Sequence, residues 1–233
     1  MLPLGELAFT GKRFQDVRTA LNKAHKTGVT AEWISYPTAP RALTDQIAVI
    51  SEEWVTGKGM PEMGFTLGGV DEINDRSVRC LLAVDADRVV HAITSWLPIH
   101  RDGEVVGWTL DFMRRRDTAI TGVMEFLIAT AATTFQAEGA ELVSLSGAPL
   151  AQLDPDTDTA GVQKLLDTMG RTLEPVYGFR SLLAFKAKFQ PAYHPLFMLY
   201  PEVAALPRIG AAITHAYLPH VTGGQVLRMV LRR

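Results

Sequence analysis

The residues with the clearest chemical potential lie in the segment 104–122, which reads EVVGWTLDFMRRRDTAITG. Asp111 interrupts an apolar run, and Arg114 follows shortly after it. Alternate side chains of a strand share a face, so Asp111 and Met113 are expected on one face and Phe112 on the other. A carboxylate in apolar surroundings needs a charged or hydrogen-bonding partner, which Arg114 could supply. The pattern indicates either a structural ion pair or a site that manages a proton and negative charge.

A second pattern lies in the segment 181–189, which is expected to form a strand. Alternation then puts Lys186 and Lys188 on the same half-apolar face. Two lysines on such a face either bind an anion or protect an exposed sheet edge from further pairing. Arg180 and Glu174 add charge nearby in the sequence. The segment is therefore a candidate anion-binding site.

A third pattern is the loop SLSGAPL at 144–150, which follows a short buried strand expected at 141–145. Ser146 and Gly147 are small, and glycine allows a backbone to approach a ligand closely. Many strand-to-loop exits have this composition, so the signal is weak by itself. The loop becomes a candidate substrate contact only beside the first two patterns.

Sequence motifs for other kinds of chemistry are missing. The six histidines show no metal-ligand spacing, and Cys80 is the one cysteine of the sequence. The sequence also lacks a P-loop, a GxGxxG fingerprint and a GxSxG nucleophile elbow. We therefore expect neither a bound metal nor a nucleotide-type cofactor.

The three patterns must be positioned by the regular elements that the periodicity predicts. Apolar residues spaced three and four apart indicate helices beginning near Phe14 and after Pro40. Apolar, β-branched segments separated by tight turns indicate antiparallel strands. The expected strands are 64–70, 79–84, 88–97, 104–113, 141–145, 181–189 and 196–200, and the further expected helices are 122–138, 162–169 and 207–233. Hairpins followed by strands that alternate with helices predict an α+β fold with a mixed, mostly antiparallel sheet flanked by helices.

Composition excludes several classes of protein. The chain has 233 residues, of which 47% are hydrophobic and 21% charged, and its net charge is -2. These values exclude a disordered tail and a disulfide scaffold and allow a sizeable core. The near-neutral charge means that any surface for a polyanion is local. We expect no membrane span and no signal peptide, and the single cysteine favours a reducing, cytosolic setting.

Several segments together resemble the C-terminal cytosolic region of bacterial phosphatidylglycerol lysyl- and alanyltransferases. The resemblance runs from about Leu7 to Leu218. It is carried by GKRFQDVRTALNKAHKTG, EMGFTLG, the strand ending DFMRRR, GVMEFLI, SLSGAPL and EPVYGFRSLLAFKAKFQP. It implies an acetyltransferase-like (GNAT) fold, with an N-terminal linker helix at 1–36, a transferase domain at 37–206 and a helical tail at 207–233.

The resemblance also implies roles for individual residues. The family's catalytic aspartate and arginine, in the motif D-x-M-R, fall on Asp111 and Arg114, and its lysine in F-K-x-K-F falls on Lys186. The loop 114–122 lacks the glycine pattern with which acetyltransferases hold the pyrophosphate of coenzyme A, so no cofactor is expected. The candidate substrate-binding residues are Glu62, Glu174, Arg180, Lys188, Ser146 and Gly147.

The function that the resemblance implies is aminoacyl transfer from aminoacyl-tRNA to the hydroxyl of phosphatidylglycerol or a related acceptor. Lysine is favoured as the amino acid because Glu62, Asp71 and Glu174 could surround its ammonium group. The implied partners are aminoacyl-tRNA, an anionic phospholipid, and a second copy of the chain or a second GNAT domain. The expected location is the cytoplasm, at the inner face of the cell membrane.

Two other interpretations stay open at this point. A coenzyme-A-dependent N-acetyltransferase would share the fold, although the missing pyrophosphate loop disfavours it. A non-catalytic half-domain that needs a second GNAT domain would present the same Asp111 and Lys186 without turnover.

Overall fold

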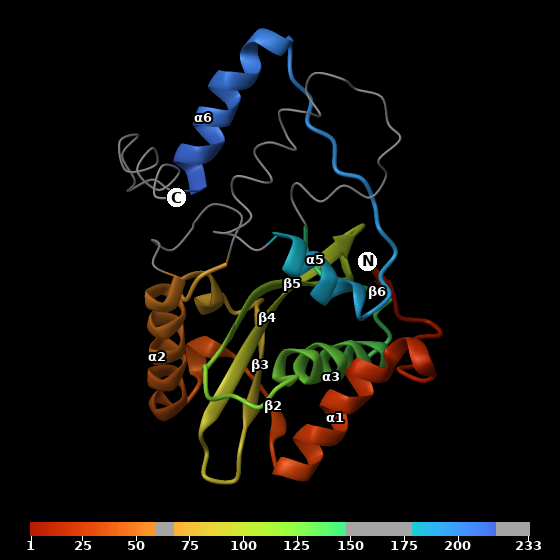
Figure 1. Cartoon of the computed structure of the whole chain (residues 1–233), viewed down its shortest axis with the longest axis vertical. Coiled ribbons are helices and arrows are strands. Elements are labelled where there is room, and N and C mark those ends of the chain that lie inside the picture. The colour runs from red at the N-terminus through yellow and green to blue at the C-terminus, as the bar shows by residue number, and fades with distance from the viewer. Residues whose placement is uncertain (59–67, 148–178, 218–233) are drawn as a thin grey trace. The chain divides into compact units, whose positions relative to one another are not determined.

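The computed structural model describes residues 1–58, 68–147 and 179–217 (Figure 1). The chain divides into two compact units. The first unit comprises residues 1–59, 67–146 and 187–194. The second unit comprises residues 60–66, 147–186 and 195–233.

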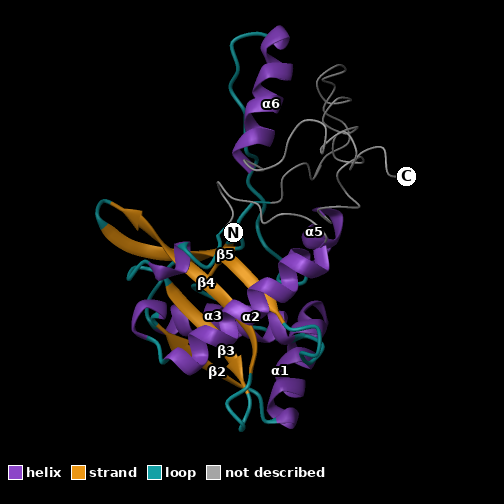
Figure 2. Ribbon diagram, turned by 90° about the vertical axis from the view of Figure 1, so that its left-hand side faces the viewer, coloured by secondary structure: helices purple, strands orange, loops and turns teal. Residues whose placement is uncertain are grey.

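The first unit is built on one mixed sheet of six strands in the order β1-β6-β5-β4-β3-β2. Figure 2 shows the neighbouring strands β5, β4, β3 and β2 of this sheet. Neighbouring strands are antiparallel except β5 and β6, which run parallel. The strands are β1 (Leu2–Pro3), β2 (Thr30–Ile34), β3 (Arg79–Val84), β4 (Val90–Arg101), β5 (Glu104–Arg115) and β6 (Leu142–Ser144). The predicted α+β class, with its mostly antiparallel sheet, is confirmed.

Helices cover both faces of this sheet (Figure 1). They are α1 (Gln15–Thr27), α2 (Arg41–Lys58) and α3 (Val123–Ala137). On one face, α2 buries Leu43, Ile47 and Ile50 against Cys80, Leu82, Ile93 and Phe112 of the sheet. On the other face, Phe135 of α3 stacks on Trp108 at 5.0 Å and meets Trp96 edge-on at 5.4 Å. The apolar spacing that predicted the three helices therefore corresponds to the residues that they bury.

A bulge between β4 and β5 changes the predicted face of one residue. Thr94 pairs with Met113 but Trp96 pairs with Leu110, so β5 carries one residue more than β4 across this interval. The backbone N–H of Phe112 donates to the Ser95 hydroxyl at 3.1 Å. The expectation of strict alternation is thus wrong here, because a bulge turns Phe112 toward the α2 side.

Two segments that were predicted to be strands are not strands. Residues 181–189 lie mostly in helix α5 (Phe179–Ala187), which is rich in Leu, Ala and Phe and has no β-branched residue. Residues 196–200 have no regular structure, and prolines at 195 and 201 flank them. A final helix, α6 (Leu206–Tyr217), confirms the helical start of the predicted tail.

Some predictions fall outside the described residues, namely the helix at 162–169 and most of the strand at 64–70. Conversely, the short strands β1 and β2 were not predicted. Among the described helices, none has the length and apolar character needed to cross a bilayer.

Candidate active site

Asp111 lies half-buried on β5 at the bulge, and a backbone turn approaches its carboxylate. The N–H of Gly68 donates a hydrogen bond to Asp111. In the same turn, the N–H of Gly69 donates to Oε2 of Glu72 at 2.7 Å. Two successive amides therefore hold two carboxylates. Glu72 begins a short 3-10 helix (Glu72–Asn74) whose Ile73 is buried in the core between α2 and the sheet.

The surroundings of Asp111 raise the pKa of its carboxyl group above the ordinary value. Burial is the largest cause, because it disfavours the ionised form. The negative charge of Glu72 acts in the same direction, whereas the hydrogen bond from Gly68 lowers the pKa of Asp111. A carboxylate with a raised pKa accepts a proton more readily near neutral pH, which suits a general base.

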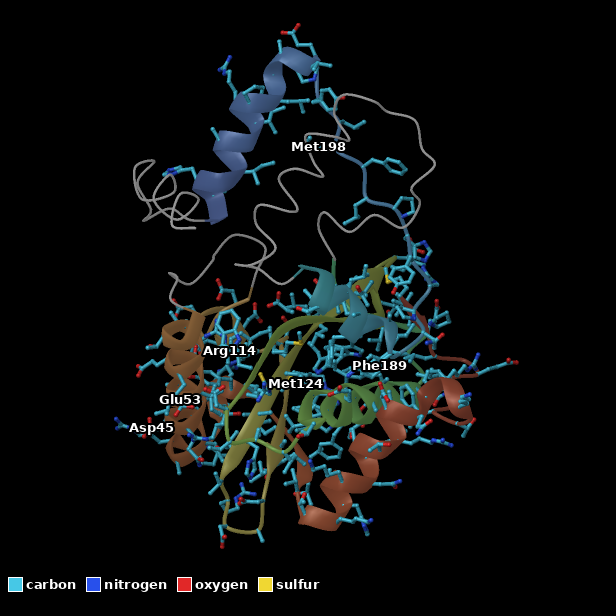
Figure 3. The ribbon with its side chains drawn as sticks, viewed as in Figure 1. Asp45, Glu53, Arg114, Met124, Phe189 and Met198 are labelled. Carbon is cyan, nitrogen blue, oxygen red and sulfur yellow. The ribbon has the colours of Figure 1, made fainter. Side chains whose placement is uncertain are left out.

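Arg114 is also buried, with 5% of its surface exposed. Its Nη1 donates to the carbonyl of Ser51 at 3.3 Å and to the Ser51 hydroxyl. The guanidinium lies 4.7 Å from the ring centre of Trp54 and 4.5 Å from that of Phe112. These contacts join β5 to α2, beside which Figure 3 shows Arg114.

The ion pair that the sequence suggested between Asp111 and Arg114 does not occur among the contacts of the described residues. Asp111 is held by Gly68, and the contacts of Arg114 that the structure describes lead to α2. The alternation of a strand did not require this pair, because side chains three residues apart lie on opposite faces. Asp111 and Arg114 therefore lie near each other in the sequence of β5, but each has different partners among the described residues.

Lys186 lies in the second unit, where it is 6% exposed. Its Nζ donates to the carbonyl of Gly147 at 2.7 Å. Burial lowers the pKa of Lys186 to about 8. The structure therefore brings two of the predicted segments together, since the lysine motif contacts the loop SLSGAPL. Next to Gly147, Ser146 has a φ of 65°, a left-handed conformation that non-glycine residues seldom adopt.

Lys188 has a different environment from Lys186. Its Nζ forms an ion pair with Oε1 of Glu125 at 2.7 Å, within the first unit. Glu125 lies in the first turn of α3. The prediction that Lys186 and Lys188 share a face is wrong, because it assumed a strand where the chain forms the end of a helix. The described ion pair ties Lys188 to the scaffold.

Three predicted substrate-binding residues are not placed by the structure. Glu62 and Glu174 lie outside the described residues, and the side chain of Arg180 in α5 is likewise not described. Their roles stay predictions. Sequence reasoning missed Glu72, although it named the adjacent Asp71. The available signal was a glutamate three positions after an amide donor, the spacing of a carboxylate that reaches back to a backbone N–H.

Comparison with known families now adds to this geometry. Residues 1–200 match the family model described as "Phosphatidylglycerol lysyltransferase, C-terminal". The chain belongs to this family. An uncharacterized protein of Corynebacterium glutamicum is 43% identical over 210 residues, which are 90% of this chain and 26% of that protein. The phosphatidylglycerol lysyltransferase of Bacillus subtilis is 24% identical over 203 residues, 87% of this chain and 23% of that protein.

The fold is likewise similar to that of a solved relative. The structure of L-PGS from Bacillus licheniformis matches with a TM-score of 0.76 and 20% identity, over 94% of this chain and 65% of that chain. The chain therefore has the fold of this solved relative. The chain spans about a quarter of the length of the two curated relatives given above.

Proposed function

We propose that the chain transfers an aminoacyl group, lysyl in preference to alanyl, from aminoacyl-tRNA to the glycerol hydroxyl of phosphatidylglycerol. The match to the family over residues 1–200 carries this proposal. It agrees with the names of relatives such as the Bacillus subtilis phosphatidylglycerol lysyltransferase and the Nocardia farcinica lysylphosphatidylglycerol biosynthesis bifunctional protein.

Asp111 is the proposed general base of the reaction. The lipid hydroxyl attacks the ester carbonyl of the aminoacyl-tRNA, a new carbon–oxygen bond forms, and the bond to the ribose oxygen breaks. The proton of the attacking hydroxyl passes to Asp111 and then to the departing ribose oxygen, so that no net proton is consumed. The donor is already an activated ester, so orientation of the two substrates and transfer of this proton are the main tasks of the protein.

The charges near Asp111 support a cationic amino acid as the transferred group. Glu72 adds a second carboxylate close enough to raise the pKa of Asp111. An ammonium group near two carboxylates would favour their ionised forms. Lysine carries two such groups when esterified to tRNA, and alanine carries one. This difference favours lysine, and the predicted Glu62 and Glu174 would add to the same preference.

Two cations complete the proposed machinery in different ways. Lys186, with a pKa of about 8, is mostly protonated near neutral pH and is the proposed partner for a phosphate or for the developing oxyanion. Arg114 was predicted to share that task. Its contacts with Ser51 and Trp54 support an anchoring role between α2 and β5 as well.

The proposed partners follow from the reaction. They are aminoacyl-tRNA, the anionic lipid, and a second GNAT domain or a second copy of the chain. The proposed place of action is the cytoplasmic face of the membrane, where the lipid headgroup meets the tRNA.

A transfer assay tests the proposal. Purified chain is mixed with radiolabelled lysyl-tRNA and vesicles that contain phosphatidylglycerol, and the lipid is extracted. We expect label in the lipid, and none when phosphatidylcholine replaces phosphatidylglycerol. Acetylation of an amine with acetyl-CoA as donor, without lipid labelling, would support the acetyltransferase instead. Binding of tRNA with no product from either donor would support the non-catalytic half-domain.

A further inference from the structure

The backbone at residue 68 comes unusually close to the carboxylate of Asp111. A Cβ atom added to Gly68 would lie 2.0 Å from Oδ2, 2.7 Å from Cγ and 3.1 Å from Oδ1 of Asp111. Contacts under 3.0 Å are essentially never made by real Cβ atoms. All three of the nearest atoms belong to the carboxylate group. Position 68 therefore excludes every side chain as long as this carboxylate keeps its orientation.

The turn that carries Gly68 is fixed to the scaffold on its C-terminal side. The N–H of Gly69 is bonded to Glu72, and the N–H of Asn74 donates to the carbonyl of Asp71 at 3.2 Å. Between them, Ile73 has no exposed surface and belongs to the core cluster between α2 and the sheet. Because the turn is anchored in this way, a side chain at position 68 would displace the carboxylate more easily than the turn.

We propose that Gly68 is a positioning residue for Asp111: its lack of a side chain lets the backbone N–H hold the carboxylate in the orientation that transfer requires. This inference rests on the proposed role of Asp111. The N–H contributes direction as well as charge stabilisation, because a hydrogen bond to one carboxylate oxygen fixes the rotation of the group. The other oxygen is then left to receive the proton of the acceptor hydroxyl.

A stability cycle tests the contact without any assay of activity. Gly68→Ala is made in the natural chain and in the Asp111→Ala variant, and thermal unfolding is measured for all four proteins. We expect Gly68→Ala to lower Tm by at least about 3 °C in the natural chain and to have little effect in Asp111→Ala, where the clashing carboxylate is gone. Gly5→Ala is the matched control, since no atom lies within 4 Å of its added Cβ. Equal losses of Tm in both backgrounds would overturn the proposal.

Two further measurements separate positioning from a purely structural role. NMR titration of the Asp111 carboxyl group should show a higher midpoint in Gly68→Ala, because the N–H that favours the ionised form is displaced. Transfer should show kcat reduced by at least about tenfold with KM changed less, as expected for a misplaced catalytic group. An unchanged titration midpoint, or an unchanged kcat, would contradict the inference. If the natural chain transfers no aminoacyl group, the proposed function fails, while the stability cycle and the titration still decide the contact.

Discussion

Two arginines lie against aromatic rings on opposite faces of the sheet, and their surroundings differ. On the α3 face, Arg79 lies over Trp33 at 4.4 Å and over Trp108 and Phe135 at 5.0 Å. Its guanidinium forms two bonds with Glu138, at 2.5 and 2.9 Å. On the α2 face, Arg114 lies over Trp54 and Phe112, and among the described residues its guanidinium bonds to Ser51.

The acids beside these arginines respond in opposite directions. The hydrogen bond and charge of Arg79 lower the pKa of Glu138. Asp111, near Arg114 in the sequence, has a raised pKa because it is buried beside another acid. An ion pair such as Arg79–Glu138 stabilises a fold, whereas a carboxylate with a raised pKa takes up a proton more readily. We therefore expect Arg79 and Glu138 on the α3 face to support the fold, and we propose that the α2 face carries the chemistry.

The largest expected effect is a difference in the free energy of unfolding between variants of the two arginines. Arg114→Ala should destabilise the chain by about 3 kcal/mol, because it removes a buried group that joins α2 to β5. Arg79→Ala should lose only about 1 kcal/mol, because its ion pair with Glu138 is partly exposed. Urea unfolding of both variants measures the difference. Equal losses of unfolding free energy in the two variants would mean that the deeper burial of Arg114 does not make it more important for stability than Arg79.

A smaller effect concerns Lys186, whose described partner is the uncharged carbonyl of Gly147. Burial lowers the pKa of Lys186 from 10.5 to about 8, so the unfolded chain binds more protons between these values. The stability of the natural chain should therefore rise with pH in that window. Lys186→Met should be more stable by about 1 kcal/mol near neutral pH, with the gap closing toward pH 10.5.

Melting curves across this pH range test the expectation for Lys186. Lys188→Met is the matched control, because Lys188 already has the carboxylate of Glu125 as a partner and should not become more stable when replaced. If the difference in Tm between Lys186→Met and the natural chain were the same at every pH, the buried charge of Lys186 would not be the cause of that difference.

The smallest expected effect is a change in the pKa of Asp111 when the neighbouring charge of Glu72 is removed. Glu72→Gln removes the like charge near Asp111 and keeps an oxygen for the N–H of Gly69. The pKa of Asp111 should fall, and the acid limb of the pH–rate profile should move to lower pH by less than about one unit. Asp71→Asn, beside it in the turn, is the control. A shift of equal size in both variants would assign the effect to general charge around the turn.

The sequence allowed much of this architecture to be predicted, but only where the pattern was long and local. Helices α1, α2 and α3 have several turns with apolar residues three and four apart. Strands β3 and β4 are long, mostly buried apolar runs, and β3, β4 and β5 are joined by tight turns. The two-residue β1 has no such pattern. Helix α5 was predicted as a strand because the short segment 181–189, with apolar residues and two lysines, fits the period of a strand and that of a helix in part.

The candidate site was predictable in its central residue but not in its partners. Asp111 stands out because a carboxylate interrupts an apolar strand. Its contact with Gly68 and the nearby charge of Glu72 depend on a turn brought to the sheet by tertiary packing, which no local spacing encodes. The contact of Arg114 with Ser51 was missed for a similar reason, since Ser51 lies on α2, far from β5 in the sequence.

The most direct test of the central claim is the rate of lysyl transfer to phosphatidylglycerol by Asp111→Asn, measured beside Arg79→Ala and the natural chain. Asparagine keeps the size of the side chain and an oxygen for the N–H of Gly68 but cannot accept the proton. We predict a loss of at least about 100-fold in kcat for Asp111→Asn, with a melting temperature equal to or above that of the natural chain, because a buried charge is removed. Arg79→Ala should transfer at nearly the natural rate at temperatures where it stays folded. Transfer by folded Asp111→Asn within a few-fold of the natural rate would contradict the assignment of chemistry to this carboxylate.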